Sequence, residues 1–181
     1  MNNEGLEYLT NSGLDDCQNL RDLDISHNVL EDETARALVG NLIRRHRCLE
    51  RLKVTGNPLF EDYAIDDDSW STTSSIVGPL PPLMCDLVHS DCLSHLNLSS
   101  TGMTTGDLDM LSTALLTNGS IRELDLSFNE IDNVLSLATA LECRKAPIHV
   151  LNLALNELVR GDHYDWGCSL GRATGGCGLT T

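Results

Sequence analysis

The chain has 181 residues and carries 12 Lys and Arg against 27 Asp and Glu, which gives a net charge of −15 at pH 7. This charge argues against nucleic acid and membranes as partners, because nucleic acid and anionic lipid surfaces attract proteins through positive potential. Only 4% of the residues are aromatic, so the core of a domain of this length must be built from aliphatic side chains.

The first element expected in chain order is a helix that has no strand before it. Residues 4–20 align with residues 33–49 at an offset of 29, and Leu6 and Leu9 fall opposite Ala35 and Leu38 at helical spacing. The chain would then begin with half of a repeating unit, so we expect a monomer or a piece of a longer solenoid. The alternative is that the first helix and the C-terminal tail act as caps.

A second pattern begins at Leu20 and recurs four more times. Leu20, Leu23, Ile25, Asn28 and Leu30 follow the spacing L-x-x-L-x-L-x-x-N-x-L, which fits neither a half-buried strand nor a helix. Later copies begin at Leu49, Leu93, Ile121 and Ile148. Successive copies are spaced by 27–29 residues, except for one longer gap between Leu49 and Leu93. Such a repeat indicates units that stack side by side and cover one another's apolar faces.

Each copy is expected to contain a short strand followed by a turn. Leu23 and Ile25 flank Asp24, so a strand places both aliphatic side chains on one face and Asp24 on the other. Asn28 falls where the chain leaves the strand, and its amide can bond to the backbone groups that the turn frees. Stacked copies predict a ladder of asparagines, interrupted by Thr101, where we expect a looser turn.

Between the strands the apolar residues change to helical spacing. Residues 31–48 carry an amphipathic stripe, with Asp32 as the expected N-cap and Arg44, Arg45 and Arg47 at the C-terminal end of the helix dipole. Similar stretches span residues 104–119, where Asn118-Gly119 is a stop signal, and residues 132–143. Parallel strands inside an arc and helices outside it are expected, because a helix is wider than the ~4.8 Å between strands.

These residues resemble the leucine-rich repeat family, and the 27–29-residue spacing resembles its ribonuclease-inhibitor-like subclass. The resemblance implies an α/β fold, a curved solenoid that is a segment of a horseshoe, with parallel strands inside and helices outside. It covers residues 1–160 in about five strand–helix units. Residues 161–181 are glycine-rich, and we expect a disordered tail there.

Residues 60–83 lengthen the second unit, and we expect a loop. They contain an acidic run, a Ser/Thr run and three prolines. One hypothesis is a docking or phosphorylation loop anchored by Trp70, and the alternative is a tolerated insertion. The helix of this unit is expected to resume near residues 82–92.

The seven cysteines form no C-x-x-C pair. Cys17, Cys48 and Cys92 lie one to three residues before the first leucine of a repeat, and we expect small buried thiols rather than disulfides. In the tail, the spacing of His163, Cys168 and Cys177 matches no common zinc pattern. We therefore predict no metal and no cofactor, and no catalytic residue either, since no nucleophile is combined with a base.

The outward strand positions are the candidate binding surface, because a rigid column of side chains loses little entropy when a protein binds. Just beyond two strands, Phe128 and Leu155 are apolar residues at a position expected to be exposed; the alternative is that they fold back over the turn. Arg51 and Lys53, with the three arginines at the helix end, suggest a contact for an acidic partner; the alternative is a helix end with solvated charges. The predicted partner-binding residues are Asp22, Asp24, Arg51, Lys53, His95, Asn97, Glu123, Asp125, Phe128, Asn152 and Leu155.

We interpret the chain as a non-catalytic protein–protein interaction module, a scaffold or regulator that binds another protein on its concave face and adjacent loops. One alternative is a GTPase-activating protein similar to the Ran activators of this family. Another is a structural component of a cytoskeletal or flagellar assembly. We expect a cytoplasmic location, because residues 1–9 lack the features of a signal peptide and no apolar run approaches the ~20 residues that span a bilayer.

Overall fold

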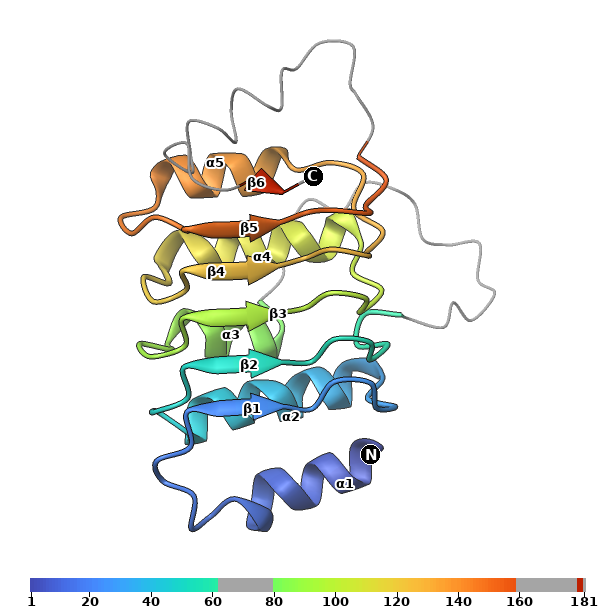
Figure 1. The fold of residues 1–181 in the computed structure, drawn as a ribbon, viewed down its shortest axis with the longest axis vertical. Helices are drawn as coiled ribbons and strands as arrows, with labels where there is room; N and C mark the ends of the chain where they lie inside the picture. The colour runs from blue at the N-terminus through green and yellow to red at the C-terminus, as the bar shows by residue number, and fades with distance from the viewer. Residues whose placement is uncertain (62–79, 159–178, 181) are drawn as a thin grey trace.

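The computed structural model describes residues 1–61, 80–158 and 179–180. Helices and strands alternate along the chain, as Figure 1 shows. The helices are α1 (Asn3–Tyr8), which continues into a π-helical turn η1 (Leu9–Gly13), α2 (Asp32–Arg45), α3 (Pro82–Val88), α4 (Thr105–Thr117) and α5 (Leu135–Cys143). The strands are β1 (Asp22–Asp24), β2 (Arg51–Lys53), β3 (His95–Asn97), β4 (Glu123–Asp125), β5 (Val150–Asn152) and β6 (Leu179–Thr180).

The strands form a single parallel sheet in the order of the sequence, β1 to β6. Its register aligns equivalent repeat positions, so that Leu23 pairs with Leu52, Leu52 with Leu96, Leu96 with Leu124 and Leu124 with Leu151. Figure 1 shows the helices stacked behind the sheet and the units following one another along the long axis. The predicted fold class is confirmed: the molecule is an open, curved α/β solenoid.

The core is a layer of aliphatic side chains between the sheet and the helices. The central strand leucines, such as Leu52 and Leu124, face helix residues such as Leu42 and Leu111, and all four are at most 1% exposed. The buried residues form a continuous cluster from Leu6 in α1 to Leu153 after β5. Burial of each such side chain contributes ~1.5–3 kcal/mol, so the apolar face of each unit is stabilised by its neighbours.

The predicted asparagine ladder is confirmed, and each amide also joins two units. The Asn57 side chain is fully buried, and its Nδ2 donates to the carbonyl oxygens of Val54 at 2.8 Å and of Ile25, one unit earlier, at 3.0 Å. Its Oδ1 accepts from the N–H groups of Asn28 at 3.1 Å and Leu30 at 3.3 Å. Asn129, in the fourth unit, forms the same kinds of hydrogen bond within its own unit and to the third unit.

Thr101 interrupts this ladder, as expected. Its hydroxyl donates to the Leu98 carbonyl at 2.8 Å and to Asn129 Oδ1 at 3.3 Å, so it bonds to its own unit and the next one. The second unit is instead joined to the third through the backbone, because the Phe60 N–H donates to the Thr101 carbonyl at 3.0 Å.

The position just beyond each strand has a left-handed backbone in every unit. The φ angles lie between 51° and 67° at His27, Gly56, Ser100, Phe128 and Leu155. Only glycine adopts this conformation without a penalty of about 1–2 kcal/mol. The turn is nevertheless kept because its N–H groups continue the sheet: that of Phe128 donates to the Ala154 carbonyl at 2.9 Å.

The helix boundaries follow the predicted signals. The Asp32 carboxylate accepts from the Thr34 N–H at 2.7 Å and the Ala35 N–H at 3.3 Å, so it performs the predicted capping role as the first residue of α2. The helix α4 ends at Thr117, directly before Asn118-Gly119. The predicted first helix is also present, with Leu6 fully buried, and the helix of the second unit resumes as α3.

Several predictions fall on residues outside the described part of the chain. Residues 62–79 include Trp70 and most of the expected insertion loop, and residues 159–178 include His163, Cys168 and Cys177. Of the C-terminal tail, the structure describes Leu179–Thr180, which pair in parallel with β5.

The prediction that Cys17, Cys48 and Cys92 are buried thiols is wrong. Cys17 and Cys92 are exposed and Cys48 is partly exposed. These cysteines precede the first leucine of a repeat, and that leucine is where burial begins: Leu49 is 1% exposed and Leu93 is 0% exposed. Cys17 and Cys92 therefore lie outside the core, although other residues of the loops between helix and strand, such as His46 and Asn118, are buried.

Candidate functional site

The sheet face that points away from the helices carries most of the predicted binding residues. We call it the open sheet face, and in Figure 1 it is turned toward the viewer. Between β2 and β5 it is hollowed by about 280 Å³, and the lining includes Arg51, His95, Glu123 and Val150. Its outward side chains are Asp22, Asp24, Arg51, Lys53, His95, Asn97, Glu123, Asp125, Val150 and Asn152.

On β1 and β2 the charges of this face pair with each other. Asp22 and Arg51 are aligned by the strand register, and Arg51 Nη1 donates to Asp22 Oδ1 at 2.9 Å and to Oδ2 at 3.1 Å. This hydrogen bond and the charge of Asp22 raise the pKa of Arg51. Lys53 Nζ lies 3.9 Å from Asp24 Oδ2. Two cations and two anions therefore offset each other at this end of the face.

Four of the predicted binding residues also have a local structural role. The Oδ1 atoms of Asp24, Asn97, Asp125 and Asn152 each accept the backbone N–H two residues further on, at 2.9–3.1 Å. The side-chain and backbone hydrogen bonds from Ser26 lower the pKa of Asp24. Sequence reasoning missed this role, although the recurrence of Asp or Asn at the third strand residue is a visible signal.

On β4 the carboxylates have weaker partners. Glu123 Oε1 lies 3.2 Å from His95 Nε2, and Asp125 Oδ1 accepts from the Ser127 hydroxyl at 2.7 Å. The next strand presents Val150 and Asn152, which carry no charge. Among the residues that the structure describes, neither β4 carboxylate forms an ion pair with a lysine or arginine at 4.0 Å or less.

The two apolar residues predicted to be exposed are exposed. Phe128 is 58% exposed and Leu155 is 67% exposed, which excludes the alternative that they fold back over the turn. They occupy equivalent left-handed positions of adjacent units. Val150 on β5, which sequence reasoning left out of the binding residues, is 42% exposed. We call Phe128 and Leu155, in the turns beyond β4 and β5, the apolar edge; Val150 lies at the start of β5, beside Glu123.

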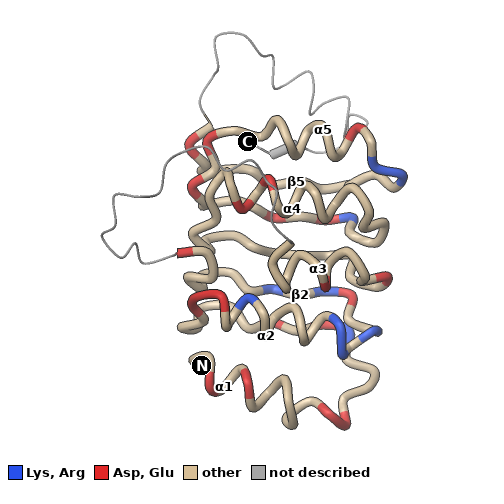
Figure 2. The backbone as a smooth tube through the Cα atoms, turned by 180° about the vertical axis from the view of Figure 1, so that it is seen from behind, with Lys and Arg blue, Asp and Glu red and all other residues tan. Residues whose placement is uncertain are grey.

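The five basic residues considered as a contact for an acidic partner do not form one surface. Arg51 and Lys53 lie on the open sheet face, whereas Arg44 and Arg45 end the helix α2, as Figure 2 shows from behind. Arg45 Nη2 lies 2.6 Å from Asp15 Oδ1, and Arg44 Nε lies 3.7 Å from Asp86 Oδ1. Four of the five are thus paired with acidic residues, which favours the interpretation as a helix end with solvated charges.

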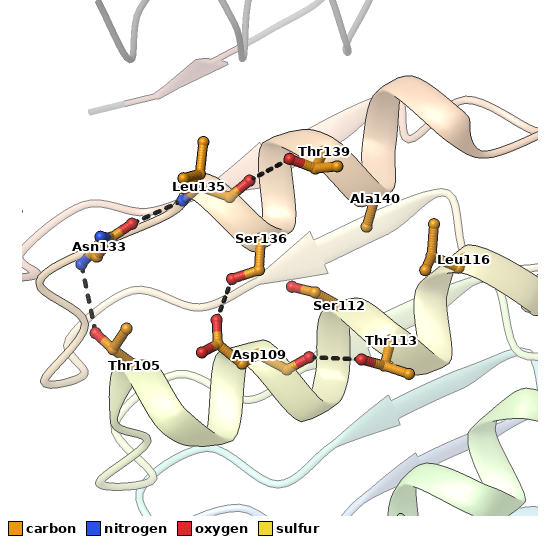
Figure 3. Close-up of a pocket in the computed structure, with 10 residues that line it drawn as sticks. All are labelled: Thr105, Asp109, Ser112, Thr113, Leu116, Asn133, Leu135, Ser136, Thr139 and Ala140. Carbon is orange, nitrogen blue, oxygen red and sulfur yellow. Dashed lines mark hydrogen bonds between the residues drawn. The ribbon is translucent and has the colours of Figure 1, made fainter. Parts of the chain in front are cut away.

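A groove on the helix side was not predicted. It lies between α4 and α5, has a volume of about 490 Å³ and includes the exposed leucines Leu116 and Leu135 (Figure 3). Its polar groups bond across the two helices: the Ser136 hydroxyl donates to Asp109 Oδ1, and the Asn133 N–H donates to Thr105 Oγ1 at 3.3 Å. These contacts hold the helices together and leave the groove without a charged group directed at a ligand.

Within residues 1–61, 80–158 and 179–180, no three His, Cys, Asp or Glu side chains are grouped as a metal ion would need. No helix in the same part of the chain is both long and apolar enough to cross a membrane.

Comparison with protein families matches residues 16–39 and 117–134 to a leucine-rich-repeat model. The matched segments contain β1 and β4 with the turns that follow them. The chain has the leucine-rich-repeat fold. Comparison of this leucine-rich-repeat chain with curated proteins gives no match.

Comparison with solved structures finds matches of low sequence identity. The structure of leiomodin-1 actin-binding site 2 is 14% identical, with 78% of this chain and 75% of that chain covered and a TM-score of 0.55. The tropomodulin C-terminal domain of Caenorhabditis elegans is 14% identical over 76% of this chain and 92% of that chain, with a TM-score of 0.45. Internalin C2 of Listeria monocytogenes is 15% identical over 99% of this chain and 76% of that chain, with a TM-score of 0.43.

Proposed function

We propose that this leucine-rich-repeat chain is a non-catalytic protein-binding module that contacts its partner with the open sheet face and the apolar edge. The observation that carries the proposal is the exposure of Phe128 and Leu155 beside a hollowed sheet face. Large apolar side chains that stay exposed in adjacent units supply the contacts on which most binding energy depends. The backbone beneath them is held by the sheet register, so little entropy is lost on binding.

The proposal is tested by replacing the apolar edge. The double substitution Phe128→Ser and Leu155→Ser is expected to lower partner capture about tenfold or more, because interface anchors typically contribute 2 kcal/mol or more. Capture is measured by quantitative mass spectrometry of proteins retained from cell extract. The matched control is Leu116→Ser with Leu135→Ser, which removes two exposed leucines from the helix side.

Equal capture by the parent and the Phe128/Leu155 variant, with loss in the Leu116/Leu135 variant, would move the binding surface to the groove between α4 and α5. Urea unfolding of both variants separates lost contacts from lost structure, since all four side chains are at least 43% exposed and should tolerate substitution.

Filamentous actin is a partner to test first. The leiomodin-1 structure with a similar fold is that of an actin-binding site. Co-sedimentation of the chain with actin filaments is the direct measurement, and recovery of the chain only in the supernatant would exclude filamentous actin. Acceleration of GTP hydrolysis across a panel of small GTPases tests the GTPase-activating alternative.

We also infer membership of the ribonuclease-inhibitor-like subclass. The repeat spacing of 27–29 residues supports it, as do helices of 14 residues in α2 and 13 residues in α4 on the outer side.

A further inference from the structure

We propose that the β4–β5 end of the open sheet face binds a basic segment of the partner protein, one that places an apolar residue on the apolar edge. This inference rests on the proposed function and adds the chemistry of the partner. It is carried by the distribution of charge over the face, by Val150 beside Glu123, and by the exposed Phe128 and Leu155 in the turns just beyond β4 and β5.

The first step is the difference in charge between the two ends of the face. Arg51 and Lys53 are already engaged by Asp22 and Asp24. On β4, Glu123 lies beside the His95 imidazole, and Asp125 accepts from the hydroxyl and the backbone N–H of Ser127. The described outward side chains of the face include four carboxylates and two permanent cations, so the excess negative charge lies on β4. Lysine or arginine of a partner is the group that would complement it.

The second step is that a neutral His95 cannot neutralise Glu123. The Ser94 hydroxyl lies 2.7 Å from His95 Nδ1, and the Glu50 carbonyl nearby already accepts from the N–H groups of Ser94 and His95. This network suits an imidazole that accepts at Nδ1 and donates from Nε2 to the Glu123 carboxylate, 3.2 Å away. A neutral imidazole gives Glu123 one hydrogen bond and no positive charge. A cationic partner group can therefore still complement this carboxylate.

The third step is the apolar edge. Phe128 and Leu155 are 58% and 67% exposed and are linked by the hydrogen bond from the Phe128 N–H to the Ala154 carbonyl. Val150 is aligned with Glu123 by the strand register, so an apolar side chain lies beside an acidic one on the neighbouring strand. Interface cores favour aromatic and aliphatic contacts, with charged contacts around them. A basic segment with one apolar residue matches both parts of this surface.

The overall charge of the chain favours the same occupant. A net charge of −15 repels acidic proteins and anionic lipid, and attracts a basic segment at long range. The association is therefore expected to weaken as salt is added.

The test is a selection of random dodecapeptides displayed on phage, with the whole chain as bait. We expect enriched peptides to carry Lys or Arg together with Leu, Phe or Trp. Synthetic copies of these peptides should bind about tenfold more weakly to a Glu123→Gln, Asp125→Asn variant and to a Phe128→Ala variant. The Asp125→Asn change keeps the turn, because Asn97 and Asn152 fill the same role in neighbouring units.

The matched control for charge is Glu4→Gln with Glu7→Gln, which removes two acidic residues from the exposed side of α1. The control for apolar area is Leu116→Ala, on the helix side. Both controls should bind the peptides within about twofold of the parent chain, since neither touches the open sheet face.

The outcomes separate this inference from the proposed function. Enriched peptides that are acidic, and that lose binding when Arg51 and Lys53 are replaced by serine, would overturn the inference and leave the open sheet face as the binding surface. Peptides that bind all face variants equally but fail on the Leu116→Ala chain would overturn both. Absence of any enriched peptide would also overturn both.

Discussion

The two ends of the open sheet face have the same backbone and different surfaces. At β1 and β2, Asp22 and Asp24 are aligned with Arg51 and Lys53, and the charges pair across the strands. At β4 and β5, Glu123 and Asp125 are aligned with Val150 and Asn152, and two apolar side chains project from the turns. The comparison teaches that the repeat specifies the inward residues and leaves the outward residues to vary. The charged side chains at one end of the face can therefore pair with each other, while those at the other end stay available to a ligand.

The largest expected effect comes from breaking the backbone geometry that both ends share. Asn57→Ala removes a fully buried amide with four hydrogen bonds to two units, and should lower the free energy of unfolding by about 2–4 kcal/mol. Urea denaturation measures this change.

The matched substitution is Asn28→Ala, at the first copy of the ladder. Asn28 is only partly buried, and its Nδ2 bonds to carbonyls of its own unit, Ile25 at 2.9 Å and Ser26 at 3.1 Å. Outside the unit, the Asn28 side chain forms an exposed contact in which Oδ1 accepts from the Met1 ammonium, whereas the Asn57 side chain makes three bonds to the preceding unit. Its loss should be clearly smaller than that of Asn57→Ala. Equal losses would contradict the view that bonds between units are what hold the turns.

An intermediate effect is expected at the left-handed position, which is glycine at one end of the face and phenylalanine at the other. Gly56→Ala should destabilise the chain by about 1–2 kcal/mol, because φ is +67° and the new Cβ would lie 2.5 Å from His27 Nδ1. Phe128→Gly, at the equivalent position, should change stability by no more than about 0.5 kcal/mol, since relief of strain is offset by unfolded-chain entropy. Thermal unfolding of both variants tests the contrast, and a larger loss for Phe128→Gly would show that its side chain stabilises the fold.

The smallest effect concerns the acid dependence of the paired end. The pKa of Asp24 is lowered from 3.8 by hydrogen bonds from Ser26, so its contribution to stability is present above pH 3.8 and is lost as the pH falls through the lower folded value. The Asp24→Asn variant should therefore have nearly the same free energy of unfolding as the parent chain at pH 7. Below about pH 4, its free energy of unfolding should fall less steeply than that of the parent. Unfolding midpoints measured from pH 7 to pH 2.5 test this prediction. An equal fall of the midpoint at acid pH in variant and parent would exclude Asp24 as a contributor to the acid dependence of stability.

Much of the fold follows from residue spacing alone. The recurrence of Leu23, Leu52 and Leu96 predicted strands whose central residue is buried, and the amphipathic stripes predicted α2, α4 and α5. Asn118-Gly119 and Asp32 marked helix ends that the structure confirms. These predictions succeeded because they depend on local periodicity and on capping bonds between residues close in sequence.

Other features depend on contacts between units and could not be read from one repeat. The left-handed conformation of Phe128 goes with a hydrogen bond from its N–H to the next unit, and the side chains of Phe128 and Leu155 give no local sign of their positive φ angles. The exposure of Cys17 and Cys92 depends on where the loop between helix and strand lies relative to the core. The groove between α4 and α5 arises only when the two helices pack.

The sequence by itself determined the repeat, the inward leucines and the order of strand, turn and helix, because an apolar side chain must be buried wherever its spacing recurs. The tertiary structure alone decided which charges meet, because a strand register aligns residues 27–44 positions apart. That alignment pairs Arg51 with Asp22 and leaves Glu123 beside His95 and Val150. The chemistry of the open sheet face is therefore a property of the stack of units and of no single unit.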